Sequence, residues 1–237
     1  MRTLFILHGW QSSKEKWEKI KNELEKLEIE VLVPDLPGFK TENELSQSWD
    51  LDNYVEWLYR FLLFREKIFL LGHSFGGRIA IKFAAKYPEK LSGLILVSSA
   101  GIKEEKTQIE KLIFSTGVEI FNSIFRLPVL NKFKPFFREI FYRYILKKTD
   151  YLQTKGPMKK TFKKTIEEDL MPYLSQIKTP TLIIWGENDK ITPLKDAFLL
   201  EENIKNSKLE ILENVGHTPH LERPEKLAEI VTRFLQS

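Results

Sequence analysis

The chain has 237 residues, of which 42% are hydrophobic and 30% are charged, and its formal net charge is +4. This composition is typical of a globular protein with one large domain, or with a core that carries an inserted subdomain. The absence of cysteine excludes disulfides, thiolate catalysis and cysteine-ligated metals. No apolar run approaches the roughly 20 residues of a membrane span, and the first run, residues 4–7, is too short for a signal peptide. We therefore expect a cytoplasmic protein.

The positive charge is unevenly distributed along the chain. Residues 126–164 contain twelve Lys and Arg against two acids, so the rest of the chain is net acidic. Three interpretations of this basic window stay open: solvated helix faces, a docking surface for an acidic partner, and a contact with a membrane surface. Nucleic-acid binding is not expected, because nothing in the sequence resembles a reading module.

Six short apolar runs alternate with longer helical patterns. Because the runs are continuously apolar, they are typical of strands buried on both faces of a parallel sheet. They are residues 3–9, 30–36, 67–74, 91–99, 180–189 and 208–217, and amphipathic helical patterns occupy residues 12–28, 52–64 and 76–91. This order predicts an α/β fold, with a mostly parallel, doubly wound sheet flanked by helices.

The alternation of strands and helices breaks at Gly101 and resumes near Thr179. The segment between them is helical in character, rich in aromatic residues, and contains the basic window. We interpret residues 101–175 as a helical cap inserted into the core, and residues 1–100 with 176–237 as the core domain. The alternative is one long, basic crossover connection, which the length of the segment disfavours.

Four of the predicted strands end in residues that can carry chemistry. In open α/β sheets, sites form beyond the carboxyl ends of the strands, so these residues should converge. They are His8, Gly9 and Trp10 after the first strand, Gly72 to Gly76 after the third, Asp189 after the fifth and His217 after the sixth. Together they supply the parts of a nucleophilic hydrolase.

The stretch G-H-S-F-G places Ser74 at the apex of a sharp strand-to-helix turn. Gly72 and Gly76 would allow the crowded backbone of such a turn, which leaves no room for side chains. The helix that follows points its first amides at any anion formed at the serine. A turn serine without chemistry is the alternative, and the strand before it and the helix after it favour the nucleophile.

Two backbone N–H groups are candidates for an oxyanion hole. One belongs to Phe75, directly after the serine, and the loop of His8, Gly9 and Trp10 supplies the second from Trp10. Such donors stabilise the negative oxygen of a tetrahedral intermediate.

A serine hydroxyl is a poor nucleophile without a base. His217, on the loop straight after the last strand, is the best candidate to take its proton. Asp189 would hold the imidazole in the correct tautomer and stabilise the imidazolium. Glu187 is a rival acid, and Asp189 could instead cap the next helix. The preceding strand offers no acid until Glu104, which favours Asp189.

The other three of the four histidines have structural interpretations. His8 is expected to brace the oxyanion loop, His73 to point away from the serine and pack, and His220 to begin a helix. No metal is expected, because no tight cluster of His, Asp and Glu has ligand spacing. A nucleotide cofactor is not expected either, because a P-loop and a G-x-G-x-x-G motif are both missing.

At these residues the sequence resembles the α/β-hydrolase superfamily, and in particular its capped serine carboxylesterases. The order Ser74, Asp189, His217 matches the family's order of nucleophile, acid and base. The blocks "LFILHGW", "DLPGF", "LLGHSFGGRIA", "PTLIIWGENDKITP" and "GHTPHLERPEKLAEIVTRFL" look like its recurrent blocks. The resemblance implies oxyanion amides at Trp10 and Phe75 and a cap domain. Members usually begin with a β-hairpin that this chain lacks, which implies about six strands and a free sheet edge.

The predicted triad indicates acyl transfer to water through an acyl-serine. We predict a cofactor-independent carboxylesterase for short to medium acyl esters and lactones. The alternatives are an acyl-homoserine lactonase, a thioesterase, an acyl-carrier-protein ester esterase, a carbon–carbon bond hydrolase and a perhydrolase. From other classes come a hydroxynitrile lyase and a non-catalytic receptor or scaffold. The basic cap resembles that of carrier-protein methyl esterases, so an acidic carrier protein is one expected partner. We expect a monomer or homodimer.

Overall fold

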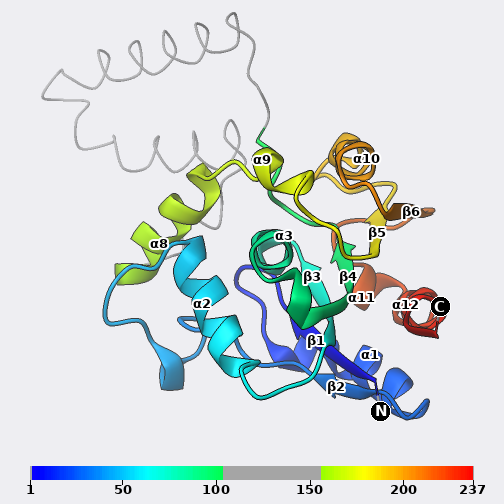
Figure 1. Ribbon diagram of the computed structural model, residues 1–237, viewed down its shortest axis with the longest axis horizontal. Coiled ribbons are helices and arrows are strands. Elements are labelled where there is room, and N and C mark those ends of the chain that lie inside the picture. Colours follow the sequence, from blue (N-terminus) through cyan, green and yellow to red (C-terminus); the bar gives the residue numbers. More distant parts are fainter. Residues whose placement is uncertain (1, 104–155, 237) are drawn as a thin grey trace, which may run out of the picture. The chain divides into compact units, whose positions relative to one another are not determined.

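A computed structural model describes residues 2–103 and 156–236 of the chain. This part forms one parallel sheet in the order β2-β1-β3-β4-β5-β6 (Figure 1). The strands are β1 Thr3–Leu7, β2 Glu30–Leu32, β3 Ile68–His73, β4 Leu91–Val97, β5 Thr181–Gly186 and β6 Ser207–Leu212. All six predicted strands are confirmed. Because every neighbouring pair is parallel, the carboxyl ends of the strands meet at one edge.

Helices connect the strands. Before β5 they are η1 Lys14–Trp17, α1 Glu18–Glu25, η2 Thr41–Asn43, α2 Leu51–Phe61, α3 Phe75–Lys86, η3 Pro88–Lys90, α8 Gly156–Glu167 and α9 Met171–Leu174. After β5 they are α10 Leu194–Asn203, α11 Pro219–Glu222 and α12 Pro224–Gln236. The start of α2 is set by a reciprocal cap, in which Asp50 accepts from the Asn53 N–H and Asn53 accepts from the Asp50 N–H, both at 3.0 Å.

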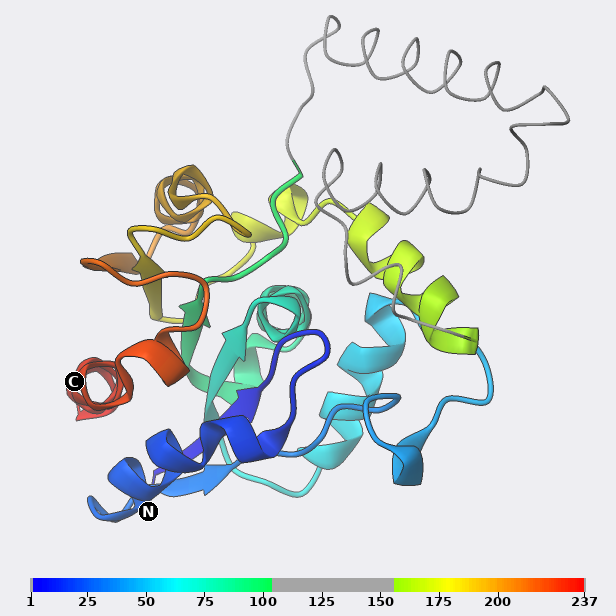
Figure 2. The same ribbon diagram turned by 180° about the vertical axis from the view of Figure 1, so that it is seen from behind.

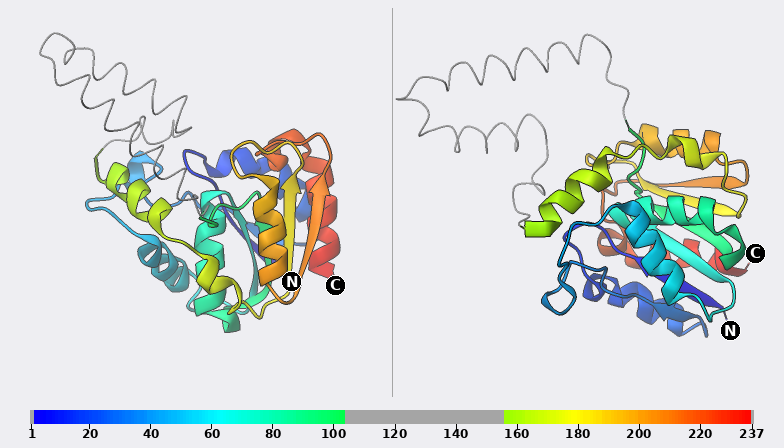
Figure 3. Two further views of the ribbon diagram at one scale, coloured as in Figure 1. Left: turned by 90° about the horizontal axis from the view of Figure 1, so that it is seen from above. Right: turned by 60° about the vertical axis from the view of Figure 1, so that its left-hand side comes forward.

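Helices cover both faces of the sheet, and the strand side chains alternate between two apolar cores. Phe5 and Leu7 of β1 face the core that includes α2, α3 and α10, whereas Leu4 and Ile6 face the core built with α1 and α12. Figure 2 shows α1 in blue and α12 in red on the same side, and Figure 3 (left) shows α10 and α12 on opposite sides of β5 and β6. Burial on both faces explains why the strands are continuously apolar.

Residues 1–102 with 156–237 form one compact unit, and residues 103–155 form another. Most of the predicted cap, residues 104–155, lies outside the described residues. Its described end, residues 156–175, groups with the core unit as α8 and α9. One polar contact that holds α8 there is the bond from the Trp49 N–H to the Thr161 hydroxyl, at 2.8 Å.

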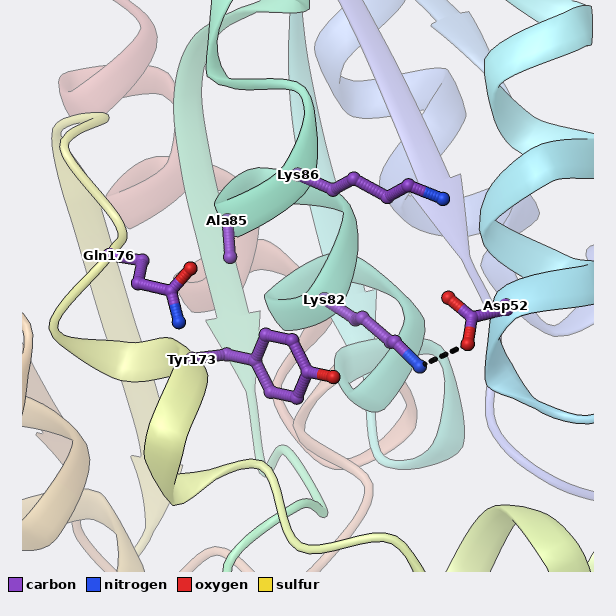
Figure 4. Close-up of a pocket in the computed structure, with 6 residues that line it drawn as sticks. All are labelled: Asp52, Lys82, Ala85, Lys86, Tyr173 and Gln176. Carbon is purple, nitrogen blue, oxygen red and sulfur yellow. Dashed lines mark hydrogen bonds and ion pairs between the residues drawn. The ribbon is translucent and has the colours of Figure 1, made fainter.

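Two basic side chains of α3 also hold residues 156–175 against the core. Lys82 is almost buried and pairs with Asp52 of α2 at 2.8 Å and with Glu168, just before α9, at 2.6 Å. Arg78, one turn earlier, donates to the backbone carbonyl of Glu168. Lys82 also lines a small surface pocket of about 260 Å³, together with Asp52, Ala85, Lys86, Tyr173 and Gln176 (Figure 4). The ion pairs therefore tie α2, α3 and the connection between α8 and α9 together.

Within residues 2–103 and 156–236, the helices are too short or too polar to cross a bilayer.

The start of α3 crosses the end of β1 at backbone contact, and only glycine fits this crossing. A Cβ at Gly76 would lie 2.1 Å from the carbonyl oxygen of Leu7. We expect Gly76→Ala to lower the free energy of unfolding by about 3 kcal/mol or more, because the backbones must separate. A Cβ at Gly156 meets nothing within 4 Å among the described residues, so Gly156→Ala should cost only the strain of its positive φ, about 1 kcal/mol. Urea denaturation of both variants measures this, and equal losses would contradict the crossing.

Candidate active site

Ser74 lies between β3 and α3 in a backbone conformation that a non-glycine residue rarely adopts. Its φ is 52° and its ψ is −113°. The turn is closed on both sides, because a Cβ at Gly72 would lie 2.5 Å from the carbonyl oxygen of Gly76. The backbone of Ser74 is also held by β4, since its N–H donates to the Val97 carbonyl at 3.2 Å. The predicted elbow glycines therefore stand where the chain has no space for a side chain.

The three predicted triad side chains lie in one hydrogen-bonded line. His217 Nε2 is 3.0 Å from Ser74 Oγ, and His217 Nδ1 is 2.9 Å from Asp189 Oδ2. The loops that carry them follow β3, β5 and β6, which are adjacent or nearly so in the sheet. With the hydroxyl donating to Nε2 and Nδ1–H donating to the carboxylate, this line can pass the serine proton to the imidazole.

Asp189 is buried and accepts four hydrogen bonds. Its Oδ1 accepts from the backbone N–H groups of Ile191 and Thr192 at 2.9 and 3.0 Å, and its Oδ2 accepts from the Thr192 hydroxyl at 2.8 Å and from His217. Burial raises the pKa of Asp189, but the bonds from His217, Ile191 and Thr192 outweigh it, so the net pKa is lowered. The carboxylate is therefore ionised and fixed in orientation.

The rival acid has a different role. Glu187 lies in the loop after β5 and accepts from the N–H of Asn214, in the exposed turn after β6, at 3.1 Å. It thus ties these two loops together, and Asp189 is the carboxylate that contacts His217.

Two further residues at the site were missed by the sequence analysis. Thr192 holds Asp189, as above, and Glu222 holds the loop on which His217 lies. The Glu222 carboxylate accepts from the N–H groups of Gly216 at 2.7 Å and Thr218 at 3.0 Å. The only sequence signals were spacings, a Thr three residues after Asp189 and a Glu five residues after His217. Such spacings are common in any turn.

The loop after β1 lies against Ser74, as its predicted role requires. A Cβ at Gly9 would lie 3.3 Å from Ser74 Cβ. The buried His8 braces this loop: the Leu36 N–H donates to His8 Nε2 at 3.0 Å, and His8 Nδ1 lies 2.8 Å from the Gly9 carbonyl. Because Nε2 accepts, Nδ1 carries the hydrogen and the ring is neutral. Burial lowers the pKa of His8, in agreement with this state.

Aromatic rings gather beside the oxyanion loop. Trp10 makes edge contacts with Phe39 at 4.9 Å, Phe75 at 5.0 Å and Phe162 at 4.8 Å between ring centroids. Phe75 in turn contacts Tyr54 at 5.3 Å. Phe162 comes from α8, so the described end of the predicted cap contributes to this cluster. The cluster includes Phe75, the residue directly after Ser74, and Trp10, the last residue of the loop that lies against Ser74.

His73 and His220 are not part of the hydrogen-bonded line of Ser74, His217 and Asp189. Both are buried, and their rings meet at 4.6 Å between centroids. His220 lies in the first turn of α11, in agreement with the expected helix start, and its ring stacks flat on that of Trp17 at 4.2 Å between centroids. His73, expected only to pack, also lies 2.8 Å from the backbone carbonyl of His217 through its Nε2. Packing alone was therefore an incomplete interpretation of His73.

Among residues 2–103 and 156–236, no group of three or more His, Cys, Asp and Glu side chains could hold a metal ion.

The buried histidines make stability depend on pH. Burial lowers the pKa of His8 from 6.5, lowers that of His73 well below 6.5, and lowers that of His220 to about 3. Below pH 6.5 the unfolded chain binds protons that the folded chain does not, so stability falls as pH falls. Each histidine contributes a slope of up to about 1.4 kcal/mol per pH unit.

Urea unfolding at several values between about pH 7 and pH 5 measures this slope. His220→Phe keeps a ring on Trp17 but cannot titrate. Its free energy of unfolding should therefore change less steeply with pH, by up to about 1.4 kcal/mol per pH unit. A free energy of unfolding that stays constant over this range would contradict the neutral histidines.

Comparisons with known proteins agree with this architecture. A family model described as alpha/beta hydrolase fold matches residues 2–224. Monoacylglycerol lipase ABHD6 from Mus musculus is 28% identical, over an alignment that covers 99% of this chain and 76% of that protein. Proline iminopeptidase from Saccharolobus solfataricus is 30% identical, over 99% of this chain and 84% of that protein.

A solved structure extends the likeness in fold. The esterase EaEST from Exiguobacterium antarcticum superposes with a TM-score of 0.75 at 22% identity, over 100% of this chain and 92% of that chain. The family model covers nearly the whole chain, and the sheet order and the turn at Ser74 fit the fold. The chain belongs to the α/β-hydrolase family.

Proposed function

We propose that the protein is a serine hydrolase of carboxylic esters, in which Ser74 is the nucleophile, His217 the general base and Asp189 the acid of a catalytic triad. The observation that carries this proposal is the hydrogen-bonded line from Ser74 Oγ through His217 to Asp189, with distances of 3.0 and 2.9 Å. The names of the relatives support ester hydrolysis, since they include a monoacylglycerol lipase.

The first half of the reaction forms an acyl-enzyme. Ser74 Oγ attacks the ester carbonyl carbon while its proton moves to His217 Nε2, and the C=O electron pair moves onto the carbonyl oxygen. Asp189, held ionised by Thr192 and Ile191, stabilises the imidazolium. The intermediate collapses, and the leaving alkoxide takes the proton from His217.

The second half repeats this sequence with water. His217 takes a proton from a water molecule, whose oxygen attacks the acyl-serine and releases the acid and free Ser74. In both halves, the backbone N–H groups of Trp10 and Phe75 are the proposed oxyanion donors. Their support is positional: Phe75 opens α3 directly after Ser74, and the loop before Trp10 touches Ser74.

The proposed substrates are apolar acyl esters of short to medium chain length, including glycerol monoesters and lactones. The aromatic cluster of Trp10, Phe39, Phe75 and Phe162 supports an apolar acyl group on the side of the oxyanion loop. A panel of p-nitrophenyl esters of increasing chain length, glycerol monoesters and lactones tests these substrates. Because one relative is a proline iminopeptidase, a prolyl arylamide belongs in the same panel as the test of a second candidate activity.

An acidic carrier protein and a cytoplasmic location are further proposals. Residues 126–155 of the basic window lie outside the described residues. In its described end, α8, Lys160, Lys163 and Lys164 are exposed, and Lys163 lies 3.8 Å from Glu167. A carrier-protein ester in the panel, measured at low and high salt, tests for docking at these lysines.

Asp189→Asn tests the assignment of the acid. We expect the variant to fold and to lose about 10⁴-fold in kcat, because the amide no longer selects the required tautomer of His217. Glu187→Gln is the matched control, since it removes the neighbouring carboxylate that does not contact His217, and its kcat should stay near that of wild type. Steady-state kinetics on a p-nitrophenyl ester measures both. The reverse order of effects would show that the wrong acid was assigned.

Phe162→Ala tests the acyl pocket. Phe162 is nearly buried and contacts Trp10, so its removal opens the aromatic cluster on the α8 side. We expect kcat/KM for a medium-chain ester to fall at least about fivefold more than kcat/KM for an acetate ester. Phe61→Ala is the control, because Phe61 packs on Phe5 at the far end of α2. An unchanged ratio of the two substrates in Phe162→Ala would contradict the apolar pocket.

A further inference from the structure

His73 connects the nucleophile's turn to the loop of the base. It is the last residue of β3 and precedes Ser74 directly, and the residue is 3% exposed. Its Nε2 lies 2.8 Å from the backbone carbonyl oxygen of His217, a residue 144 positions later in the chain. A carbonyl oxygen can only accept, so His73 Nε2 must carry the hydrogen.

The surroundings of His73 favour a neutral ring in this tautomer. Its Nδ1 is buried and has no hydrogen-bond partner among residues 2–103 and 156–236, so a second proton there would be an unpaired buried charge. The ring meets Trp17 at 5.9 Å, His220 at 4.6 Å and His217 at 5.1 Å between centroids. Burial, and next the charges of His220 and His217, lower the pKa of His73 well below its usual value. The hydrogen bond to the His217 carbonyl and the charge of Asp189 act in the opposite direction and are outweighed.

Glu222 also holds the loop of His217, through the residues on either side of the histidine. Glu222 accepts from the N–H groups of Gly216 and Thr218, on either side of the histidine, and from the Thr218 hydroxyl at 2.9 Å. The carbonyl oxygen of His217 does not contact Glu222 and instead accepts the hydrogen bond from His73 Nε2. The backbone around the proposed base is thus fixed from two sides by Glu222 and His73.

We infer that His73 is a positioning residue that sets the separation of Ser74 Oγ and His217 Nε2, by donating its Nε2–H to the backbone carbonyl of His217. The inference rests on the proposed function, in which this separation governs proton transfer. One residue is covalently next to the nucleophile and hydrogen-bonded to the base's backbone, so the two loops cannot shift independently. An error of about 1 Å in such a geometry can cost about 100-fold in rate.

Two substitutions separate positioning from packing. His73→Leu fills much of the space but leaves the His217 carbonyl without its donor. His73→Gln keeps an N–H donor, because its Nε2 is as many bonds from Cα as the imidazole Nε2. Leu71→Ala is the matched control: Leu71 is two residues earlier on β3, fully buried in the core that contains Trp17, and makes its contacts with apolar side chains.

We expect kcat of His73→Leu, and its rate of labelling by a fluorophosphonate, to fall about 10- to 100-fold while KM stays within about twofold. His73→Gln should regain most of this loss. Leu71→Ala should lose stability but keep kcat close to that of wild type. The inference is overturned if His73→Leu keeps the kcat of Leu71→Ala, or if His73→Gln is no better than His73→Leu.

A measurement on the unmodified protein covers the case in which the variants do not fold. Imidazole ¹⁵N NMR should find His73 in the Nε2–H tautomer, without titration, from about pH 5 to about pH 9. An Nδ1–H tautomer, or titration near the usual histidine pKa, would overturn the hydrogen bond. Ser74→Ala separates the two claims: if it still turns over esters, the proposed function fails, whereas the NMR result decides the hydrogen bond independently of activity.

Discussion

The turn at Ser74 is the constraint on which the rest of the site depends. Its φ of 52° and ψ of −113° are costly for a serine, and such strain persists only where the surroundings enforce it. Here the surroundings are backbone: α3 touches β1 at Gly76 and folds back on β3 at Gly72, with no space for a Cβ at either residue. The hydroxyl is therefore presented at the sheet edge, in front of the first amides of α3.

His217 and Asp189 reach this hydroxyl because their loops are held by hydrogen bonds other than the two that join the three side chains. Asp189 is fixed by the backbone and hydroxyl of Thr192, and the loop of His217 is fixed by Glu222 and His73. Preorganisation of this kind removes the need for the groups to rearrange during reaction. Burial lowers the pKa of the neighbouring His73 and His220 and keeps both rings neutral, so neither places a positive charge beside His217.

The sequence was sufficient to predict the features that local patterns encode. Continuous apolar runs located the strands, and G-H-S-F-G located the turn, because the physical requirement of each is met within a few residues. The pairing of His217 with Asp189 was predicted from their positions after successive strands. The helix expected at residues 12–28 proved shorter and begins with a 3-10 turn at Lys14–Trp17.

The supporting contacts could not be predicted in the same way. His73 meets the backbone of a residue 144 positions away, and the meeting atoms depend on how β3 and the loop after β6 are placed by the whole sheet. Thr192 and Glu222 sit in ordinary turn sequences, and only the fold gives their oxygens these partners. Residues 104–155 of the predicted cap lie outside the described residues, so the cap stays a prediction there.

Covalent labelling of Ser74 by a fluorophosphonate, read by intact mass, tests the central claim most directly. An activated serine should give one adduct on the wild-type protein, located on Ser74, and His217→Gln should label much more slowly because the hydroxyl loses its base. An adduct that persists in Ser74→Ala, or a folded wild-type protein that is not labelled, would contradict the account of Ser74 as an activated nucleophile.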